Sequence, residues 1–69
     1  MIKYYKTPSR YLAVHNINGV EFCVNIDIAA NSVEWIQFNL VKSIYMVECS
    51  REEVKEAFSK VNNSLSILI

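Results

Sequence analysis

Hydrophobic and polar residues alternate along two consecutive stretches of the chain, residues 11–17 and residues 20–28. Alternation with a period of two is typical of β-strands, because successive side chains point to opposite faces of a sheet. The two stretches are joined by Asn18-Gly19, and an Asn-Gly pair in this position is the strongest local signal of a two-residue hairpin turn. The pattern therefore predicts a β-hairpin, with the single glycine of the chain where a positive φ is required.

The register of this hairpin separates a strongly apolar face from a mixed one. The apolar face pairs Ile17 with Val20, His15 with Phe22, Ala13 with Val24 and Tyr11 with Ile26. The opposite face pairs Asn16 with Glu21, Val14 with Cys23, Leu12 with Asn25 and Arg10 with Asp27. We expect the first face to form the core of the domain, because only that face is apolar along most of its length.

Two further stretches, residues 33–40 and residues 43–48, also alternate. In the first of them, Ile36, Phe38 and Leu40 lie on one side, and Val33, Trp35, Gln37 and Asn39 lie on the other. A helix over residues 33–47 is the alternative, but the β-branched and aromatic residues favour strands. We therefore expect residues 11–48 to form an antiparallel sheet of about four strands.

A change of period after residue 48 predicts a helix. Ser50, with Glu53 three residues later, forms the capping-box signature of a helix N-terminus. The apolar residues that follow recur at the spacing of one helix face, and they are Val54, Ala57, Phe58 and Val61. This pattern predicts an amphipathic helix over residues 50–62. The apolar tail, residues 64–69, alternates again, and we expect it to be buried as a fifth strand or against a neighbouring copy.

The predicted fold is one α+β domain over residues 1–69, with a small antiparallel sheet that starts at the hairpin, one C-terminal amphipathic helix and the candidate fifth strand. A core of this size supplies only about 3–5 kcal/mol, and such domains usually depend on disulfides, a metal or a partner chain. Hydrophobic residues make up 52% of the chain, which leaves more apolar surface than one helix can cover. We therefore predict a homo-oligomer. Its interface is expected to include apolar residues of the mixed hairpin face and of the tail, namely Leu12, Val14, Cys23, Leu65, Ile67 and Ile69.

Charge is balanced overall but uneven along the chain. Seven Lys and Arg residues stand against seven Asp and Glu residues, so the basic footprint of a nucleic-acid-binding protein is missing. Residues 1–10 nevertheless carry Lys3, Lys6 and Arg10 without an acid, and we expect them to form a basic N-terminal arm. The sequence has no secretory signal and no apolar run of about 20 residues, so we expect a cytoplasmic protein that does not engage a membrane and whose two cysteines stay reduced.

The residues that could carry chemistry are few. Two cysteines 26 residues apart and one histidine do not supply the four closely spaced ligands of a zinc site, so neither a metal nor another cofactor is expected. His15 lies beside Phe22 on the apolar face, where it is either a core residue or a ligand-binding residue. Nucleophilic catalysis needs a nucleophile, a base and an orienting group, and we therefore predict that the protein is not an enzyme.

Two features point to binding. Trp35 lies on the opposite side of its strand from Ile36, so it is either an interface anchor or a residue covered by the helix. The run of residues 3–6 joins two aromatic rings to positive charge, which suits a nucleotide base and its phosphate; the alternative is an ordinary edge strand or a frayed end. The residues predicted to bind a ligand or partner are Lys3, Tyr4, Tyr5, Lys6, Arg10, Tyr11, His15, Trp35 and Gln37.

Two segments of the chain resemble the small FlbD-type flagellar proteins. Residues 17–27, INGVEFCVNID, are similar to that family's LNG-x-EF-x-(V/L)-N-x-D segment, and residues 45–54, YMVECSREEV, are similar to its closing strand and ES-x-EEV helix start. The residues before Arg10 are extra, and the middle of the chain lacks the family's Pro-Asp turn and second Asn-Gly turn. The resemblance implies the element order β-β-β-β-α and carries no catalytic residues.

Together these features predict a small, non-enzymatic, oligomeric binding protein that sequesters a small ligand such as a nucleotide signal or inhibits a host protein. Ile, Asn and Lys are frequent and have A/T-rich codons, which suggests an AT-rich genome such as that of a phage, a mobile element or a low-GC bacterium. For a phage-encoded protein, the expected location is the host cytoplasm. The alternative is a structural or regulatory adaptor that resembles the FlbD-type proteins and has a protein partner.

Overall fold

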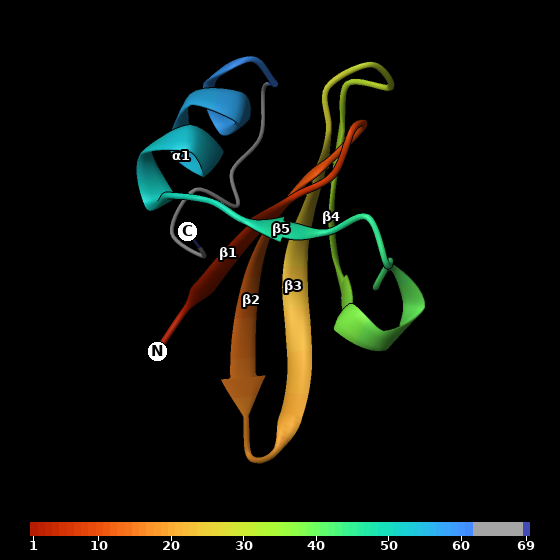
Figure 1. The fold of residues 1–69 in the computed structure, drawn as a ribbon, viewed down its shortest axis with the longest axis vertical. Coiled ribbons are helices and arrows are strands. Elements are labelled where there is room, and N and C mark those ends of the chain that lie inside the picture. The colour runs from red at the N-terminus through yellow and green to blue at the C-terminus, as the bar shows by residue number, and fades with distance from the viewer. Residues whose placement is uncertain (62–68) are drawn as a thin grey trace.

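The computed structural model describes residues 1–61 and residue 69. Five strands form one antiparallel sheet in the order β4-β3-β2-β1-β5. The elements are β1 (Lys3–Lys6), β2 (Tyr11–Ile17), β3 (Val20–Asp27), β4 (Ser32–Gln37), the 3₁₀-helix η1 (Phe38–Leu40), β5 (Val47–Glu48) and α1 (Arg51–Ser59). The β2–β3 hairpin extends away from α1 (Figure 1). The predicted α+β class is confirmed, whereas the strand predicted in the tail lies outside the described residues apart from Ile69.

The central hairpin has the predicted register. Every predicted pair from Tyr11 opposite Ile26 to Ile17 opposite Val20 is present. Asn18 and Gly19 have φ values of 53° and 86°, as a type I′ turn requires at both central positions. Local turn chemistry alone was therefore sufficient to align these two strands.

Helix α1 begins at the predicted capping box. The Ser50 hydroxyl accepts a hydrogen bond from the Glu53 main-chain N–H at 3.1 Å, and a Glu53 carboxylate oxygen accepts one from the Ser50 N–H at 2.9 Å. These bonds satisfy two N–H groups that have no partner inside the helix. The helix ends at Ser59, three residues before the predicted end at residue 62.

The segment expected to be a basic arm supplies a strand instead. Strand β1 lies between β2 and β5, with Tyr4 opposite Ala13. The tight turn that returns the chain to β2 is closed at Thr7, whose main-chain N–H donates to the Arg10 carbonyl oxygen at 2.8 Å. Its hydroxyl also accepts the N–H of Ser9 at 3.2 Å and that of Arg10 at 3.0 Å. Lys3–Lys6 are thus part of the sheet, which is the strand alternative, although β1 is not an edge.

The strands predicted over residues 33–40 and 43–48 are shorter than expected. Strand β4 ends at Gln37, where η1 turns the chain over the sheet, and only Val47 and Glu48 of the second stretch are extended. A turn occupies the rest of that stretch, because the Ser43 hydroxyl accepts the N–H of Tyr45 at 3.1 Å and the Ser43 carbonyl oxygen accepts that of Met46 at 3.3 Å. The serine side chain thus competes with strand pairing for the Tyr45 N–H.

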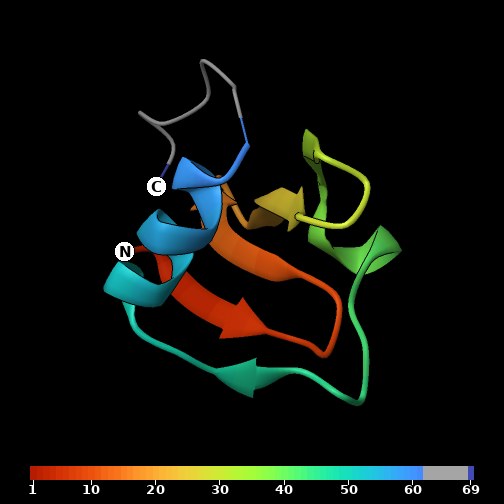
Figure 2. The same cartoon turned by 90° about the horizontal axis from the view of Figure 1, so that it is seen from above.

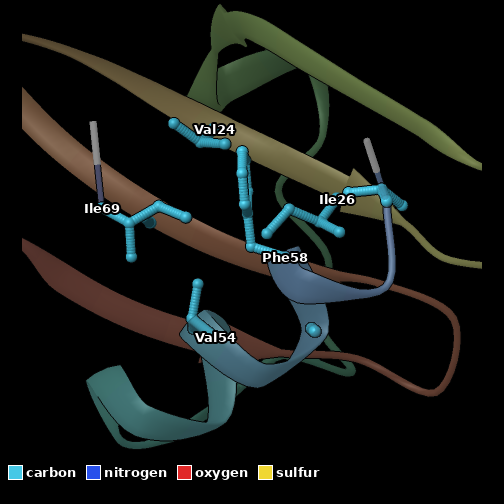
Figure 3. Close-up of a cluster of buried hydrophobic side chains, with 8 residues drawn as sticks. Val24, Ile26, Val54, Phe58 and Ile69 are labelled. Atoms are coloured by element: carbon cyan, nitrogen blue, oxygen red, sulfur yellow. The ribbon is translucent and has the colours of Figure 1, made fainter. Parts of the chain in front are cut away.

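The sheet is covered on both faces. We call the face under α1 the helix face and the opposite one the far face; Figure 2 shows α1 lying to one side of the sheet. Figure 3 shows the core of the helix face, in which Val24 and Ile26 of β3 meet Val54 and Phe58 of α1. The buried residues of this core are Ala13, Val24, Ile26, Val54, Ala57, Phe58, Val61 and Ile69.

A second core fills the far face, and it overturns the prediction of an exposed apolar surface there. Leu12 and Cys23 are fully buried and Val14 is 3% exposed. They pack under Phe38 of η1, with partly buried Tyr5, Ile36, Val41 and Met46 around them. The prediction that Leu12, Val14 and Cys23 form a surface for oligomerisation is therefore wrong, because the chain covers them itself.

The remaining predicted interface residues belong to the tail. Leu65 and Ile67 lie outside the described residues. Ile69 is 6% exposed and packs in the core of the helix face. Its main-chain oxygen accepts hydrogen bonds from the Tyr4 hydroxyl and from the Arg51 guanidinium, both at 3.2 Å. The expectation that this end of the tail is buried is confirmed at Ile69.

Candidate functional site

The aromatic and basic side chains of β1 are not gathered into one ligand site. Strand alternation sends Tyr4 and Lys6 to the helix face, and Lys3 and Tyr5 to the far face. Tyr4 bonds Ile69, and the ring of Tyr5 stacks on that of Phe38 with a centroid distance of 5.9 Å. The structure thus gives both rings packing partners within the chain and divides the four side chains between the two faces.

Lys6 connects the sheet to the start of α1. Its ammonium lies 2.9 Å from a Glu53 carboxylate oxygen, and this hydrogen bond raises the pKa of Lys6. The pKa of Glu53 is lowered, first by the hydrogen bond from the Ser50 N–H and then by the one from Lys6. Both side chains are about 40% exposed, so solvent and salt weaken their attraction.

Acidification is expected to loosen this end of the helix. Because the pKa of Glu53 is lower in the folded chain than its ordinary 4.5, its contribution to stability is complete above pH 4.5 and is lost as pH falls through the folded value. Glu53→Gln should therefore flatten the acid side of the stability profile, measured as urea midpoints between pH 7 and pH 3. An unchanged profile in this variant would assign the acid sensitivity to other carboxylates.

A basic cleft lies beside the turn between β1 and β2. It has a volume of about 410 Å³ and separates that turn from the segment that follows η1. The described residues that line it are Thr7, Pro8, Ser9, Arg10, Leu40, Val41, Lys42, Ser43 and Tyr45. Two of them are cations, four carry hydroxyl groups and none is acidic. The basic cleft is therefore a concave surface suited to a small anion.

Local hydrogen bonds fix the main chain of both cationic residues beside the cleft. Arg10 follows the turn at Thr7, and the Thr7 hydroxyl accepts a hydrogen bond from the Arg10 main-chain N–H. On the other wall, the Lys42 N–H donates to the Phe38 carbonyl oxygen at 2.9 Å, and the Lys42 ammonium lies 5.8 Å from the centre of the Phe38 ring. Phe38 is itself 6% exposed in the core of the far face, so Lys42 contacts a residue whose position is fixed by packing. Within residues 1–61 and residue 69, neither cation forms an ion pair.

Tyr45 provides an aromatic surface at the same cleft. Its side chain is 69% exposed, and its main-chain N–H is held by the Ser43 hydroxyl. An exposed aromatic ring next to two cations can stack on a heterocyclic base while the cations hold its phosphate. Of Arg10, Lys42 and Tyr45, the sequence predicted only Arg10 as a site residue. Lys42 and Tyr45 lie more than 30 residues after Arg10, and no local pattern connects them to it.

A second surface contains three of the predicted residues, which are His15, Trp35 and Gln37. The ring of Trp35 stacks on that of Phe22, with a centroid distance of 5.8 Å and an angle of 10° between the rings, and the ring of His15 meets it edge-on at 5.2 Å. We call His15, Phe22 and Trp35 the aromatic face. Gln37 lies opposite Phe22 at its border. Phe22 was not predicted as a site residue, and Tyr11 lies apart, packed against the core of the helix face.

The aromatic face occupies the part of the helix face that α1 does not reach. Trp35 pairs with Val24 and therefore points to the same side as the core, yet it remains 37% exposed. Ile17 and Val20 at the tip of the hairpin are 47% and 46% exposed. The helix covers only the end of this face nearest to it (Figure 1), and the anchor role of Trp35 stays a prediction.

The two thiols are in apolar or half-buried places. Burial raises the pKa of Cys23 to about 11 and also raises that of Cys49, so both stay protonated at neutral pH. Among residues 1–61 and residue 69, no group of three or more His, Cys, Asp or Glu side chains could hold a metal ion. The same part of the chain contains no helix that is both long and apolar enough to cross a membrane.

No protein-family model, curated protein or solved structure matches this chain. The resemblance to the FlbD-type proteins therefore stays a prediction. We infer the function from the geometry of the basic cleft and of the aromatic face.

Proposed function

We propose that this chain is a non-enzymatic binding protein that sequesters a small nucleotide-like anion in the basic cleft. The observation that carries the proposal is the meeting of Arg10 and Lys42 in one acid-free concavity of a chain whose net charge is zero. Segments far apart along the chain supply the two cations, so their meeting is a product of the fold.

The chemistry of the cleft fits a phosphate joined to an aromatic base. The planar guanidinium of Arg10 can hold two phosphate oxygens at once, and the ammonium of Lys42 adds a point charge from the opposite wall. The hydroxyls of Ser9 and Ser43 offer further donors, and the exposed ring of Tyr45 offers a stacking surface. The volume of about 410 Å³ lies within the range of small-molecule sites, about 300–1,000 Å³.

The residues of the cleft support binding rather than turnover. No histidine, carboxylate or thiol is found among the described residues that line it, so the groups that usually act as general base or nucleophile are missing from this wall. His15 belongs to the aromatic face and does not line the cleft. A protein with this arrangement acts by lowering the free concentration of its ligand. The free thiols of Cys23 and Cys49 are compatible with the reducing cytoplasm in which we propose that it acts.

The aromatic face favours a second candidate function, inhibition of a host protein or an adaptor role. Exposed aromatic clusters are common anchors of protein interfaces. This function needs a protein partner and no small ligand, so the response to nucleotides separates the two candidates.

Calorimetric titration with four probes tests the proposal. ATP, AMP, inorganic tripolyphosphate and adenosine separate the contribution of the phosphate from that of the base. We expect ATP to bind most tightly, tripolyphosphate and AMP more weakly and adenosine weakest, with all phosphate binding reduced by added salt. Absence of heat with every probe, or adenosine binding as tightly as ATP, would contradict the proposal and leave the protein-partner function.

A further inference from the structure

The outer edge of β4 is an open strand edge. Within the described part of the chain, β4 pairs only with β3 and ends the sheet. Its sequence, SVEWIQ, contains neither proline nor lysine, which commonly protect such edges, and Glu34 is its single charge. The opposite edge is β5, whose two residues offer too little backbone for strand pairing. The fold therefore has one edge at which another strand can add.

The aromatic face reaches this edge. Trp35 belongs to β4 itself, and Phe22 and His15 extend the ring cluster inward across β3 and β2. The partly exposed Ile17 and Val20 continue the apolar surface toward the hairpin tip. Partly exposed apolar side chains that gather beside an open strand edge favour an interaction surface over ordinary exterior.

We propose that a second copy of this chain pairs with β4, antiparallel, about a two-fold axis that passes through Trp35. Residues that lie directly opposite each other in antiparallel strands point to the same face of the sheet. A two-fold axis normal to the sheet also keeps every side chain on its own face. One residue of β4 must therefore lie opposite the same residue of the second copy, with the axis between these two. For a six-residue strand this leaves four positions at which three or more residues pair, namely Val33, Glu34, Trp35 and Ile36.

Charge and length select Trp35 among these positions. An axis through Glu34 places two carboxylates directly opposite each other, which is destabilising. An axis through Val33 pairs only residues 32–34, because β4 begins at Ser32, and an axis through Ile36 pairs only residues 35–37, because η1 begins at Phe38. An axis through Trp35 pairs residues 33–37, with Glu34 opposite the second copy's Ile36 and Val33 opposite the second copy's Gln37.

This register extends the ring stack across the interface. Directly opposed residues of antiparallel strands have Cβ atoms about 4.5–5.5 Å apart, so the two Trp35 rings are within contact distance. Phe22 already stacks on Trp35, and the pairing therefore produces one row of four rings, two from each copy. The contact uses the open edge of both copies, so it closes at a dimer and does not grow into a filament.

The dimer contact is separate from the proposed ligand site. None of the residues of β4 lines the basic cleft. Either proposal can therefore fail while the other holds.

Light scattering after size exclusion tests the association. We expect a mass of about 16 kDa, twice that of the 8.0 kDa chain, and this mass should fall toward that of a single chain on dilution. Trp35→Lys places two ammonium groups at the axis and should raise the dimer dissociation constant at least about tenfold. Ile44→Lys adds the same charge at a 91% exposed apolar residue away from β4 and should leave the mass unchanged. A monomer at every concentration, or equal loss of the dimer in both variants, would overturn the proposal.

Cross-linking tests the register and does not depend on the Lys variant folding. In a Cys49→Ser background, with Cys23 buried, oxidised glutathione is added to Trp35→Cys and, separately, to Glu34→Cys. The proposed axis sets the two introduced thiols of W35C opposite each other, whereas each thiol of E34C faces the second copy's Ile36. We expect disulfide-linked dimer to form at least about tenfold faster in W35C. Equal rates, or faster cross-linking of E34C, would overturn the register.

Discussion

The Leu12→Ala variant is expected to unfold at a much lower urea concentration than the unmodified protein at 25 °C. Leu12 is fully buried in the core of the far face, beneath Phe38. Removing a buried leucine side chain costs about 2–5 kcal/mol, because apolar contacts are lost and a cavity remains. A domain of this size has about 3–5 kcal/mol to lose, so the substitution removes most of its stability. Urea unfolding followed by circular dichroism measures the loss directly.

Leu40→Ala is the matched control for this prediction. Leu40 is the same residue type, but it is 69% exposed at the wall of the basic cleft. Its replacement should change the free energy of unfolding by no more than about 0.5 kcal/mol. Should Leu12→Ala unfold at the same urea concentration as Leu40→Ala, Leu12 would have to lie on the surface, as the sequence suggested, and the second core would be wrong.

The second large effect is expected at the basic cleft. Arg10→Gln combined with Lys42→Gln should weaken ATP binding about a hundredfold. Each cation supplies a charge-assisted contact to phosphate, and losing about 1.4 kcal/mol per contact corresponds to about tenfold per residue. Glutamine keeps a polar side chain at both positions, although a shorter one, and removes the charge.

A second double variant controls for net charge. Lys3→Gln with Lys55→Gln removes the same two charges from exposed positions outside the cleft. ATP affinity should stay within about threefold of the unmodified protein, since distant exposed charges are screened. Similar losses in both double variants would mean that the ligand responds to overall charge and not to a built site.

The hairpin and the helix were predictable because their signals are local. Asn18 and Gly19 determine a turn of known length, and the turn determines the register of every pair from Tyr11 to Ile17. Ser50 and Glu53 likewise identify the helix start through bonds within four residues. Neither prediction required knowledge of what packs on these elements.

The second core was not predictable from the same pattern. Leu12, Val14 and Cys23 alternate with residues of the helix face, but they are covered by Phe38, Val41 and Met46, which follow at least 15 residues later. Whether the far face is dry depends on the turn at η1, and no strong local signal marks that turn. An apolar strand face can be identified from sequence, whereas its cover comes from tertiary packing.

The two surfaces differ in the same way. The hairpin register already placed His15 beside Phe22, so one part of the aromatic face follows from local rules. Trp35 joins them only because the turn after β3 sets the register of β4; there Asp27 accepts the Ala30 N–H at 3.1 Å and Asn31 adopts a φ of 51°. The basic cleft depends on tertiary contact alone and could not have been assembled from the sequence.

An NMR titration of isotope-labelled protein with ATP tests the central claim most directly. If the basic cleft binds nucleotide phosphate, the amide signals that move will be concentrated in residues 7–10 and 40–45, with Tyr45 following ATP more than tripolyphosphate. A spectrum that does not respond, or shifts confined to the aromatic face, would contradict the account.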